Sequence, residues 1–349
     1  MRSKQFGGKL TKTWKLIYQN SPNWKDGVFQ NLEKTSSAID WKQLPEILCR
    51  QIKGHHNGYP QLPLPIKDFD ASEFLKPSKD PKFIWFGHSV VLIRWHDMSI
   101  LIDPMFGSDA SPIGPKRTKR FSNNTLDIIS TLPNIDIVLL THDHYDHLDY
   151  ESIQLLKAKT KKYIVALGCK RHLEHWGVEA ERVVEMDWWT SLVEGGIRIT
   201  FTPTRHFSGR GLTSLSKCMW GGWALQSEDA NIWFSGDSGY GSHFEEIGKR
   251  LGPFDIGFIE CGQYCKDWPQ VHLFPHEGIQ AAKDVGVRIA IPVHWAGFNL
   301  SYQHSWFEPA VEFKKSAKQE NIIAITPKLG EIFNAQSISE NWWEVHIEL

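Results

Sequence analysis

From Lys82 onward, short apolar runs alternate with polar turn residues, and this alternation predicts a mixture of strands and helices. Nine β-branched or aromatic runs predict strands at Phe83–Phe86, Val90–Trp95, Ser99–Ile102, Ile135–Leu140, Ile197–Phe201, Gly222–Leu225, Asn231–Phe234, Ile256–Ile259 and Arg288–Val293. Helices are predicted at 149–159, 169–175, 242–251, 275–285 and 308–319. Because many strands have hairpin-like neighbours, the pattern favours an α/β fold in which sheets pack face to face beneath covering helices.

Residues 1–78 follow a different pattern, rich in loops and in prolines. The run Gln61-Leu62-Pro63-Leu64-Pro65 cannot form a helix, since proline removes backbone donors and biases the residue before it toward extended geometry. We therefore expect residues 1–78 to be an extension that wraps a main domain at residues 79–349. A short helix is expected within this extension, near residues 40–52.

The composition is that of a globular protein and gives no sign of a nucleic-acid partner. Hydrophobic residues make up 41% and charged residues 23% of the 349 residues, a balance that suits a soluble fold. The formal net charge of −1 supplies no overall field that would attract nucleic acid. The five cysteines are scattered and odd in number, which argues against a disulfide framework and for a reducing, cytoplasmic compartment.

The first 25 residues are basic. They contain Arg2 and five lysines but no acidic residue before Asp26, and Leu16 and Ile17 lie among them. Such a segment can rest on an anionic membrane surface as a peripheral contact, or it can be a solvated arm. No stretch of 18 apolar residues occurs in the sequence, so no membrane span is predicted.

Several predicted strands end directly in residues that can bind a metal ion. The strand at Ile135–Leu140 leads into Thr141 and then into a hexad of possible ligands. The other strand ends lead to His206, Asp237 and His294. Ligands just past strand ends can converge at one edge of a sheet, where a rigid scaffold fixes their geometry. The hexad is His142-Asp143-His144-Tyr145-Asp146-His147.

The ligand types and their spacing indicate two metal ions. Imidazole and carboxylate ligands suit Zn²⁺, with iron or manganese as the alternatives. The hexad packs four ligands into six residues, which cannot all reach one ion without strain. Two ions roughly 3.5–4 Å apart can activate a water molecule and stabilise both the attacking and the leaving oxygen.

Together these residues resemble the metallo-β-lactamase superfamily, and further motifs resemble its N-acyl-phosphatidylethanolamine-hydrolysing phospholipase D branch. The resemblance covers roughly residues 80–315. It implies an αββα four-layer sandwich with a dinuclear site at one edge and makes residues 79–349 the catalytic domain. The branch motifs are Trp85-Phe86-Gly87-His88-Ser89, Leu101-Ile102-Asp103-Pro104, Gly114-Pro115-Lys116-Arg117, Gly252-Pro253-Phe254-Asp255, Val271-His272, Val293-His294-Trp295 and Gln303-His304-Ser305-Trp306-Phe307-Glu308-Pro309.

The resemblance also implies a role for each site residue. One metal would be held by His142, His144 and His206, and the other by Asp146, His147 and His294. Asp237 would bridge the two, and Asp146 and Asp237 are the candidate catalytic carboxylates. Tyr145 and His272 would contact the substrate. Asp143 departs from the branch, whose membrane enzyme carries an amide there, and this adds a negative charge beside the site.

The remaining candidates each have two interpretations. Asp103 either accepts a hydrogen bond from a ligand histidine or is a turn residue before Pro104. His272 and His304 could bind phosphate or protonate a leaving group. Lys116 and Arg117, with the basic residues that follow them, could hold a substrate phosphate or could belong to a solvated loop.

The function predicted is that of a dinuclear metal-dependent hydrolase. The leading hypothesis is a phosphodiesterase of phospholipase D type, acting on N-acyl-phosphatidylethanolamine-like or other organic phosphodiesters. The alternative is a lactonase or amide hydrolase of the same fold, because the same activated water attacks carbonyl groups. The expected partner is a small-molecule or lipid phosphodiester. The sequence leaves the oligomeric state open, a homodimer included.

Overall fold

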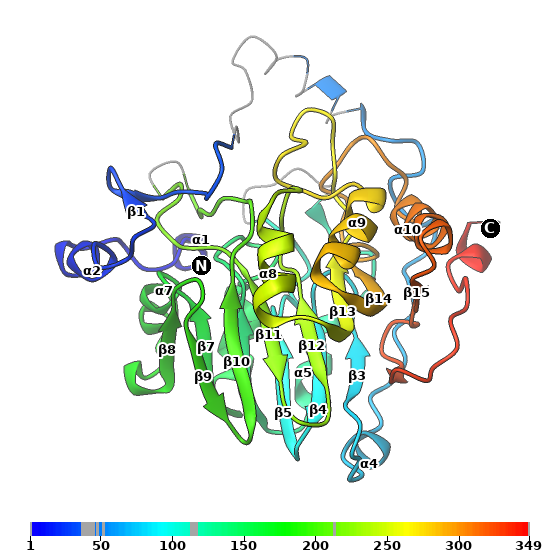
Figure 1. Ribbon diagram of the computed structural model, residues 1–349, viewed down its shortest axis with the longest axis horizontal. Coiled ribbons are helices and arrows are strands. Elements are labelled where there is room, and N and C mark those ends of the chain that lie inside the picture. Colours follow the sequence, from blue (N-terminus) through cyan, green and yellow to red (C-terminus); the bar gives the residue numbers. More distant parts are fainter. Residues whose placement is uncertain are drawn as a thin grey trace.

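Two seven-stranded sheets pack face to face in the computed structural model, and helices cover both outer faces (Figure 1). The structure describes residues 2–35, 46, 49–50, 53–111, 118–211 and 214–347. The layers therefore follow the order helix, sheet, sheet, helix, which is the αββα sandwich predicted from the sequence.

The first sheet has the order β16-β3-β4-β5-β6-β7-β8, with β5 to β8 parallel to one another. Its strands are β16 (Ile332–Phe333), β3 (Lys82–Trp85), β4 (Val91–Trp95), β5 (Met98–Ile102), β6 (Ile135–Leu140), β7 (Thr160–Ala166) and β8 (Val183–Met186).

The second sheet has the order β15-β14-β13-β12-β11-β10-β9, with β12 to β15 parallel. Because β11 is antiparallel to both β10 and β12, β10 runs in the same direction as this parallel group. The strands are β15 (Ile323–Ala324), β14 (Val287–Val293), β13 (Phe254–Glu260), β12 (Asn231–Phe234), β11 (Gly222–Gln226), β10 (Ile197–Thr202) and β9 (Ser191–Glu194).

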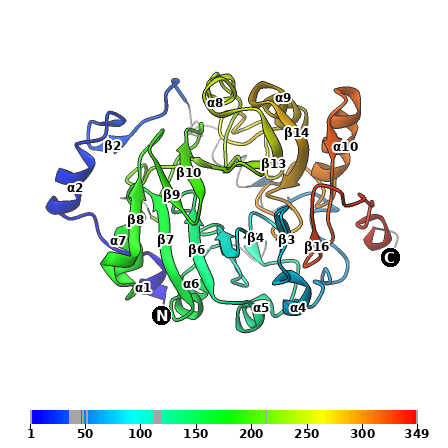
Figure 2. The ribbon, with the colours of Figure 1, turned by 60° about the horizontal axis from the view of Figure 1, so that its bottom comes forward.

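Helices flank the sheets on both sides (Figure 2). The second sheet carries α8 (His243–Leu251), α9 (Pro275–Val285) and α10 (Glu308–Gln319), and the first carries α5 (Thr125–Thr131), α6 (Tyr150–Leu156) and α7 (Lys170–His175). Helix α9 illustrates how the sequence sets its bounds. Pro275 occupies the first turn, where its missing N–H is not needed, and Gly286 ends the helix with a φ of +80°.

The core lies between the sheets. Phe83 of β3 and Phe258 of β13 meet across it with their ring centroids 5.3 Å apart. The strands β6, β13 and β14 are buried along almost their whole length, because neighbouring layers cover both of their faces. Fully burying one large apolar side chain contributes roughly 1.5–3 kcal/mol, so these strands anchor the edge at which they end.

All nine predicted strands are present, with ends within two residues of the prediction. The five predicted helices are present too, although α6 ends three residues early, at Leu156. Strands β7, β8 and β9 were missed, as were the two-residue strands β15, β16, β1 (Trp24–Lys25) and β2 (Val28–Phe29). In β7, Lys161 and Lys162 interrupt the apolar run, and their side chains pair with Asp136 of β6 and Glu194 of β9 at the surface.

Residues 2–35 form small elements that pack on the sheet edge near α7 (Figure 1). They are α1 (Arg2–Gln5), α2 (Lys12–Tyr18), β1 (Trp24–Lys25) and β2 (Val28–Phe29). Later in the chain, α4 (Ala71–Phe74) precedes β3, and short 3₁₀ turns lie at Ala180–Arg182 and Glu344–His346. The helix expected near residues 40–52 lies largely outside the described residues. Within the described part of the chain, no helix is long and apolar enough to cross a membrane.

Candidate metal centre

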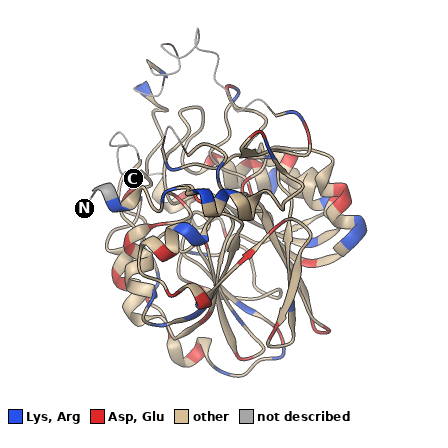
Figure 3. Cartoon of the chain, turned by 90° about the vertical axis from the view of Figure 1, so that its left-hand side faces the viewer, with Lys and Arg blue, Asp and Glu red and all other residues tan. Residues whose placement is uncertain are grey.

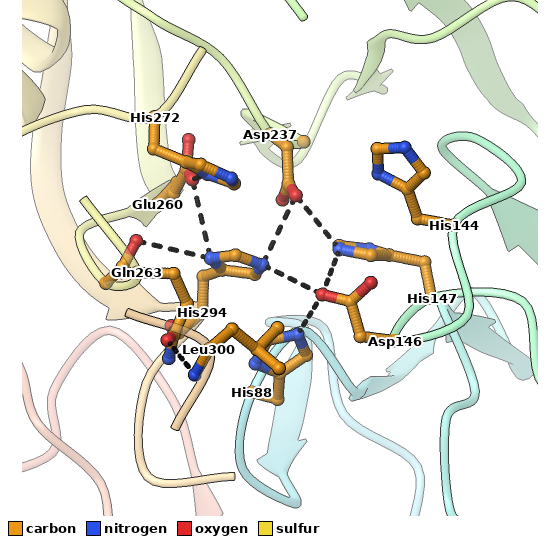
Figure 4. A network of polar contacts seen from close by, with 12 residues as sticks. His88, His144, Asp146, His147, Asp237, Glu260, Gln263, His272, His294 and Leu300 are labelled. Atoms are coloured by element: carbon orange, nitrogen blue, oxygen red, sulfur yellow. Dashed lines mark hydrogen bonds and ion pairs between the residues drawn. The ribbon is translucent and has the colours of Figure 1, made fainter. Parts of the chain in front are cut away.

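The candidate ligands gather where the carboxyl ends of strands from both sheets meet (Figure 4). Strand β6 leads into the hexad, β10 into the loop of His206, β12 into Asp237, and β14 directly into His294. Parallel strands end at the same edge, so residues far apart in sequence arrive at one place. The structure brings together all seven predicted ligands: His142, His144, Asp146, His147, His206, Asp237 and His294.

The ligands fall into two groups that match the split implied by the resemblance. In the first, Nδ1 of His144 lies 2.9 Å from Nε2 of His142 and 3.2 Å from Nε2 of His206. In the second, Oδ2 of Asp146 lies 3.5 Å from Nε2 of His147 and 3.4 Å from Nε2 of His294. Each group therefore presents three ligand atoms to a common point.

Asp237 lies between the two groups. Its Oδ2 is 3.1 Å from Nε2 of His147 and 3.2 Å from Nε2 of His294. The same oxygen is 3.7 Å from Nε2 of His206 and 3.9 Å from Nε2 of His142. A single carboxylate thus faces imidazoles of both groups, which is the position that a bridging ligand requires.

The outward nitrogens of the ligand imidazoles, which face away from Asp237, form hydrogen bonds with other residues. Nδ1 of His142 lies 2.9 Å from Oγ1 of Thr141, whose own hydroxyl donates to Asp103. The ring of His206 donates from Nδ1 to the carbonyl of Val271 at 2.7 Å. Such contacts fix the tautomer and leave the inward nitrogen free to bind a metal.

The charge of the centre also suits cations. Burial lowers the pKa values of His142 and His206 well below their usual range, so these rings are neutral. Burial alone would raise the pKa values of Asp146 and Asp237, but the facing imidazoles, His147 foremost, hold both well below the usual value. The same carboxylates overcome the effect of burial and raise the pKa values of His147 and His294, so these two rings attract positive charge. Imidazoles and ionised carboxylates gathered at a buried point are the donors that Zn²⁺ and related metals bind.

The distances between the ligand nitrogens of the first group also fit a bound metal ion. Zinc–nitrogen bonds of about 2.0–2.1 Å in a tetrahedron separate two ligand nitrogens by roughly 3.3 Å. The nitrogens of His142, His144 and His206 lie 2.9 and 3.2 Å apart, close to that value. Since the inward nitrogens of His142 and His206 carry no proton, only one proton, on Nδ1 of His144, is available for the two contacts, and a shared cation would account for both.

The two acidic residues expected beside the ligands have different surroundings. Asp103 accepts hydrogen bonds from Nδ1 of His147 at 2.7 Å and from the amide of Thr141 at 2.8 Å, so it contacts a candidate ligand directly. Asp143 instead accepts from the amide of Gly209 at 2.7 Å and from Nε2 of His172 at 3.1 Å. The guanidinium of Arg171 lies 3.5 Å from the Asp143 carboxylate and offsets its charge.

The predicted substrate-binding residues are not all at the centre. The His272 ring stacks on His294 with the centroids 5.2 Å apart, and its Nδ1 pairs with Glu260. The hydroxyl of Tyr145 donates to the carbonyl of Arg210 at 2.5 Å. Both nitrogens of the buried His304 ring are engaged by backbone groups, at 3.0 and 2.8 Å. The fold thus supplies a structural role for His304, and its substrate contact stays a prediction.

The basic cluster expected around Lys116 and Arg117 is described only in part, because both residues lie outside the described residues. Of its other members, Lys119 pairs with Asp109 at 3.0 Å. The guanidinium of Arg120 is buried and donates to the backbone carbonyls of three residues rather than facing solvent. Arg120 therefore holds loops together and is not available to a substrate.

Sequence reasoning did not assign His88 and Glu260, which also lie in this cluster. Nε2 of His88 lies 2.9 Å from Oδ2 of Asp146, and Oε1 of Glu260 lies 3.4 Å from Nδ1 of His294. The sequence contained the information needed to find both residues. Glu260 ends β13 and His88 follows β3, so the strand-end rule that found the other ligands applied to them as well.

Comparisons with known proteins agree with this geometry. Residues 98–295 match a family model described as Beta-lactamase superfamily domain. An uncharacterized protein of Mycobacterium tuberculosis is 33% identical over 325 residues, which are 91% of this chain and 85% of that protein. The N-acyl-phosphatidylethanolamine-hydrolyzing phospholipase D 1 of Caenorhabditis elegans is 30% identical over 289 residues, covering 78% of this chain and 80% of that protein. The structure of Igni18, a metallo hydrolase from Ignicoccus hospitalis, is similar to this one with a TM-score of 0.57. The match covers 72% of this chain and 97% of the Igni18 chain, at 18% sequence identity.

Proposed function

This chain belongs to the β-lactamase superfamily and is a metal-dependent hydrolase, and from that premise we propose that it hydrolyses phosphodiesters in the manner of a phospholipase D. The proposed substrates are N-acyl-phosphatidylethanolamine-like or other organic phosphodiesters. The observation that carries the proposal is the double group of ligands joined at Asp237, in a chain 30% identical to a phospholipase D over 289 residues.

The proposed ligands of one zinc ion are His142, His144 and His206. Those of the second are Asp146, His147 and His294, with Asp237 shared by both, and iron or manganese is the alternative metal. Two such ions, when bound, supply an activated water and neutralise charge that develops on phosphoryl oxygens. The distances and the anchored outer nitrogens described above support this assignment.

The chain's own residues would then orient the reactants. Asp146 and Asp237 are the proposed catalytic carboxylates because Oδ2 of each faces Nε2 of the candidate ligand His147. His272 borders the ligands, is partly exposed, and pairs through Nδ1 with the buried Glu260. That pairing leaves Nε2 to bind a phosphoryl oxygen or to deliver a proton to the leaving oxygen.

The charge of Asp143 does not oppose an anionic substrate. Its carboxylate faces Gly209, His172 and Arg171, not the inward nitrogens of the ligands. Burial alone would raise its pKa, but the hydrogen bond from His172 and the charge of Arg171 lower it. The pair of Asp143 and Arg171 is close to neutral when viewed from the ligands.

The basic segment at the start of the chain supports peripheral contact with an anionic membrane from the cytoplasmic side. Leu16 is 66% and Ile17 43% exposed on α2, which also carries Lys12 and Lys15. Figure 3 shows the Lys and Arg positions in blue on this side of the molecule. A cavity of about 1700 Å³ opens beside this helix, between Phe6, the lysines and the α7 region. Its lining includes Tyr150, His172 and Arg210 but none of the candidate ligands, so it would serve lipid contact and not catalysis.

Residues 1–78 are proposed to act as an extension of a catalytic domain at residues 79–349. Backbone contacts support this division, since Leu64 donates to Phe121 at 3.0 Å and Lys67 donates to Leu329 at 2.9 Å. The extension thus lies along the main domain at several points.

The test is a hydrolysis screen combined with metal analysis. The purified protein is expected to carry close to two transition-metal ions, and the variants His142→Ala and Asp237→Ala to lose metal and activity. His96→Ala, a surface histidine paired with Asp229, is the control that should change neither. Substrates should include bis-p-nitrophenyl phosphate, N-acylated phosphatidylethanolamine and lactones. Efficient lactone hydrolysis without phosphodiesterase activity would favour the lactonase alternative.

A further inference from the structure

The N-terminal segment contacts a candidate metal ligand through Asn31. The side-chain amide of Asn31 donates from Nδ2 to the carbonyl oxygen of His206 at 2.8 Å. Its Oδ1 accepts from the backbone amide of His206 at 3.1 Å and from Nε1 of Trp220 at 3.0 Å. One side chain, 175 residues away in sequence, therefore pairs with both backbone groups of His206.

This pairing matters because His206 lies in a loop. The residue follows β10, outside any strand, and is fully buried. A buried amide and carbonyl need partners, and in a sheet a neighbouring strand supplies them. Asn31 supplies them here. Together with the Val271 carbonyl, which holds the ring through Nδ1, it fixes both the backbone and the ring orientation of His206.

A second contact from the same segment reaches the same loop. The amide of Gly8 donates to Nδ1 of His172 at 3.0 Å, and Nε2 of His172 donates to Asp143 at 3.1 Å. Asp143 in turn accepts from the amide of Gly209, three residues after His206. A side chain at position 8 would meet the carbonyl oxygen of Arg171 at 2.1 Å, so the close approach requires glycine.

We infer that residues 4–31 act as a brace for the metal centre, in which Asn31 is a positioning residue that holds the ligand His206. The brace acts on the ion of His142, His144 and His206 and leaves the second ion to its own ligands. This inference rests on the proposed assignment of His206 as a metal ligand.

The test compares Asn31→Ala and Asn31→Asp with Asn23→Ala in the full-length, metal-loaded chain. Asp has the size of Asn and keeps the acceptor for the His206 amide, but it loses the donor and sets an oxygen against the His206 carbonyl. Asn23 belongs to the same segment and bonds to Asp187 at 3.3 Å, away from the ligands, so it is the matched control. Zinc release to a chromogenic chelator gives the dissociation constants of both ions, and the absorption spectrum of the cobalt-substituted protein reports ligand geometry.

Loss of a group that orients a metal ligand typically weakens metal binding by about 10–100-fold. We expect that loss for one ion in both Asn31 variants, with an altered cobalt spectrum, while the second ion and the Asn23 variant behave as wild type. Unchanged binding of both ions, or equal weakening of both, would overturn the inference. A wild-type chain that does not bind two ions would refute the proposed function as well, whereas normal wild-type binding with unaffected variants refutes the brace alone.

Discussion

The substitution Asp103→Asn isolates one hydrogen bond behind the metal centre. Asp103 directly follows β5, is fully buried, and accepts from three donors. Its Oδ1 accepts from the Thr141 amide at 2.8 Å, and its Oδ2 accepts from the Thr141 hydroxyl at 2.6 Å and from Nδ1 of His147 at 2.7 Å. An asparagine amide has only one acceptor oxygen, so in either orientation an NH₂ group faces a donor.

The magnitude follows from the hydrogen bonds lost. The Thr141 hydroxyl can rotate and find another partner, but Nδ1 of His147 cannot. A hydrogen bond to a charged group contributes about 1.5–3 kcal/mol, and at 1.36 kcal/mol per tenfold this corresponds to roughly 10- to 150-fold. We expect metal binding to weaken by that factor at the ion assigned to Asp146, His147 and His294.

The assay is competition with a chelator of known affinity, followed at both ions. Asp136→Asn is the control, because Asp136 also accepts a backbone amide, that of Ser99 at 2.8 Å, but near the start of β6 and far from the ligands. If Asp103→Asn retained both ions within threefold of the wild-type affinity, the claim that Asp103 orients His147 for the metal would be wrong.

Three further predictions concern the substrate, the membrane and pH. His272→Ala should keep both metals yet lower kcat for a phosphodiester, and wild-type turnover by this variant would exclude a substrate contact. Replacement of Lys9, Lys12 and Lys15 by Ala should weaken binding to anionic vesicles roughly 100-fold in a sedimentation assay, at about 1 kcal/mol per lysine, whereas three Lys→Ala replacements on α10 should not. Burial raises the pKa of Glu185 from 4.5 to about 7. The folded state therefore keeps a proton that the unfolded chain has released between these values, and the free energy of unfolding should fall as pH rises from about 4.5 to 7, by up to about 3 kcal/mol. Urea unfolding of Glu185→Gln should lack this slope, and parallel curves for the two proteins would contradict the assignment.

The sequence predicted the parts of the centre that follow directly from strands. His206, Asp237 and His294 each follow a β-branched or aromatic run, and the buried parallel strands carry them to one edge. The partners of these residues were not predictable in the same way. Nothing in the pattern around Asn31 distinguishes it from a solvated loop residue, since its role depends on a loop far along the chain.

Charged residues were misinterpreted where their partners come from distant elements. Arg120 looked like part of a solvent-facing basic cluster, but its guanidinium is buried over the Phe298 ring at 4.6 Å and bonds to backbone carbonyls. Asp143 looked like an uncompensated charge, and its partner Arg171 comes from α7. Local periodicity reports which face of an element is buried, and it does not report which distant side chain meets it there.

The long separation between Asn31 and His206 has a consequence for the order of events during synthesis. At about 5–20 residues per second, the 175 residues between them take roughly 9–35 s to appear. Throughout that interval, Tyr18, Trp24 and Phe29 can bury one another, because their rings lie 4.8–5.6 Å apart and they are close in sequence. The segment can therefore keep these three aromatic rings shielded from water while the rest of the chain is synthesised. Since His294 is the last candidate ligand to emerge, the ion assigned to Asp146, His147 and His294 can be captured only after most of the chain has been translated.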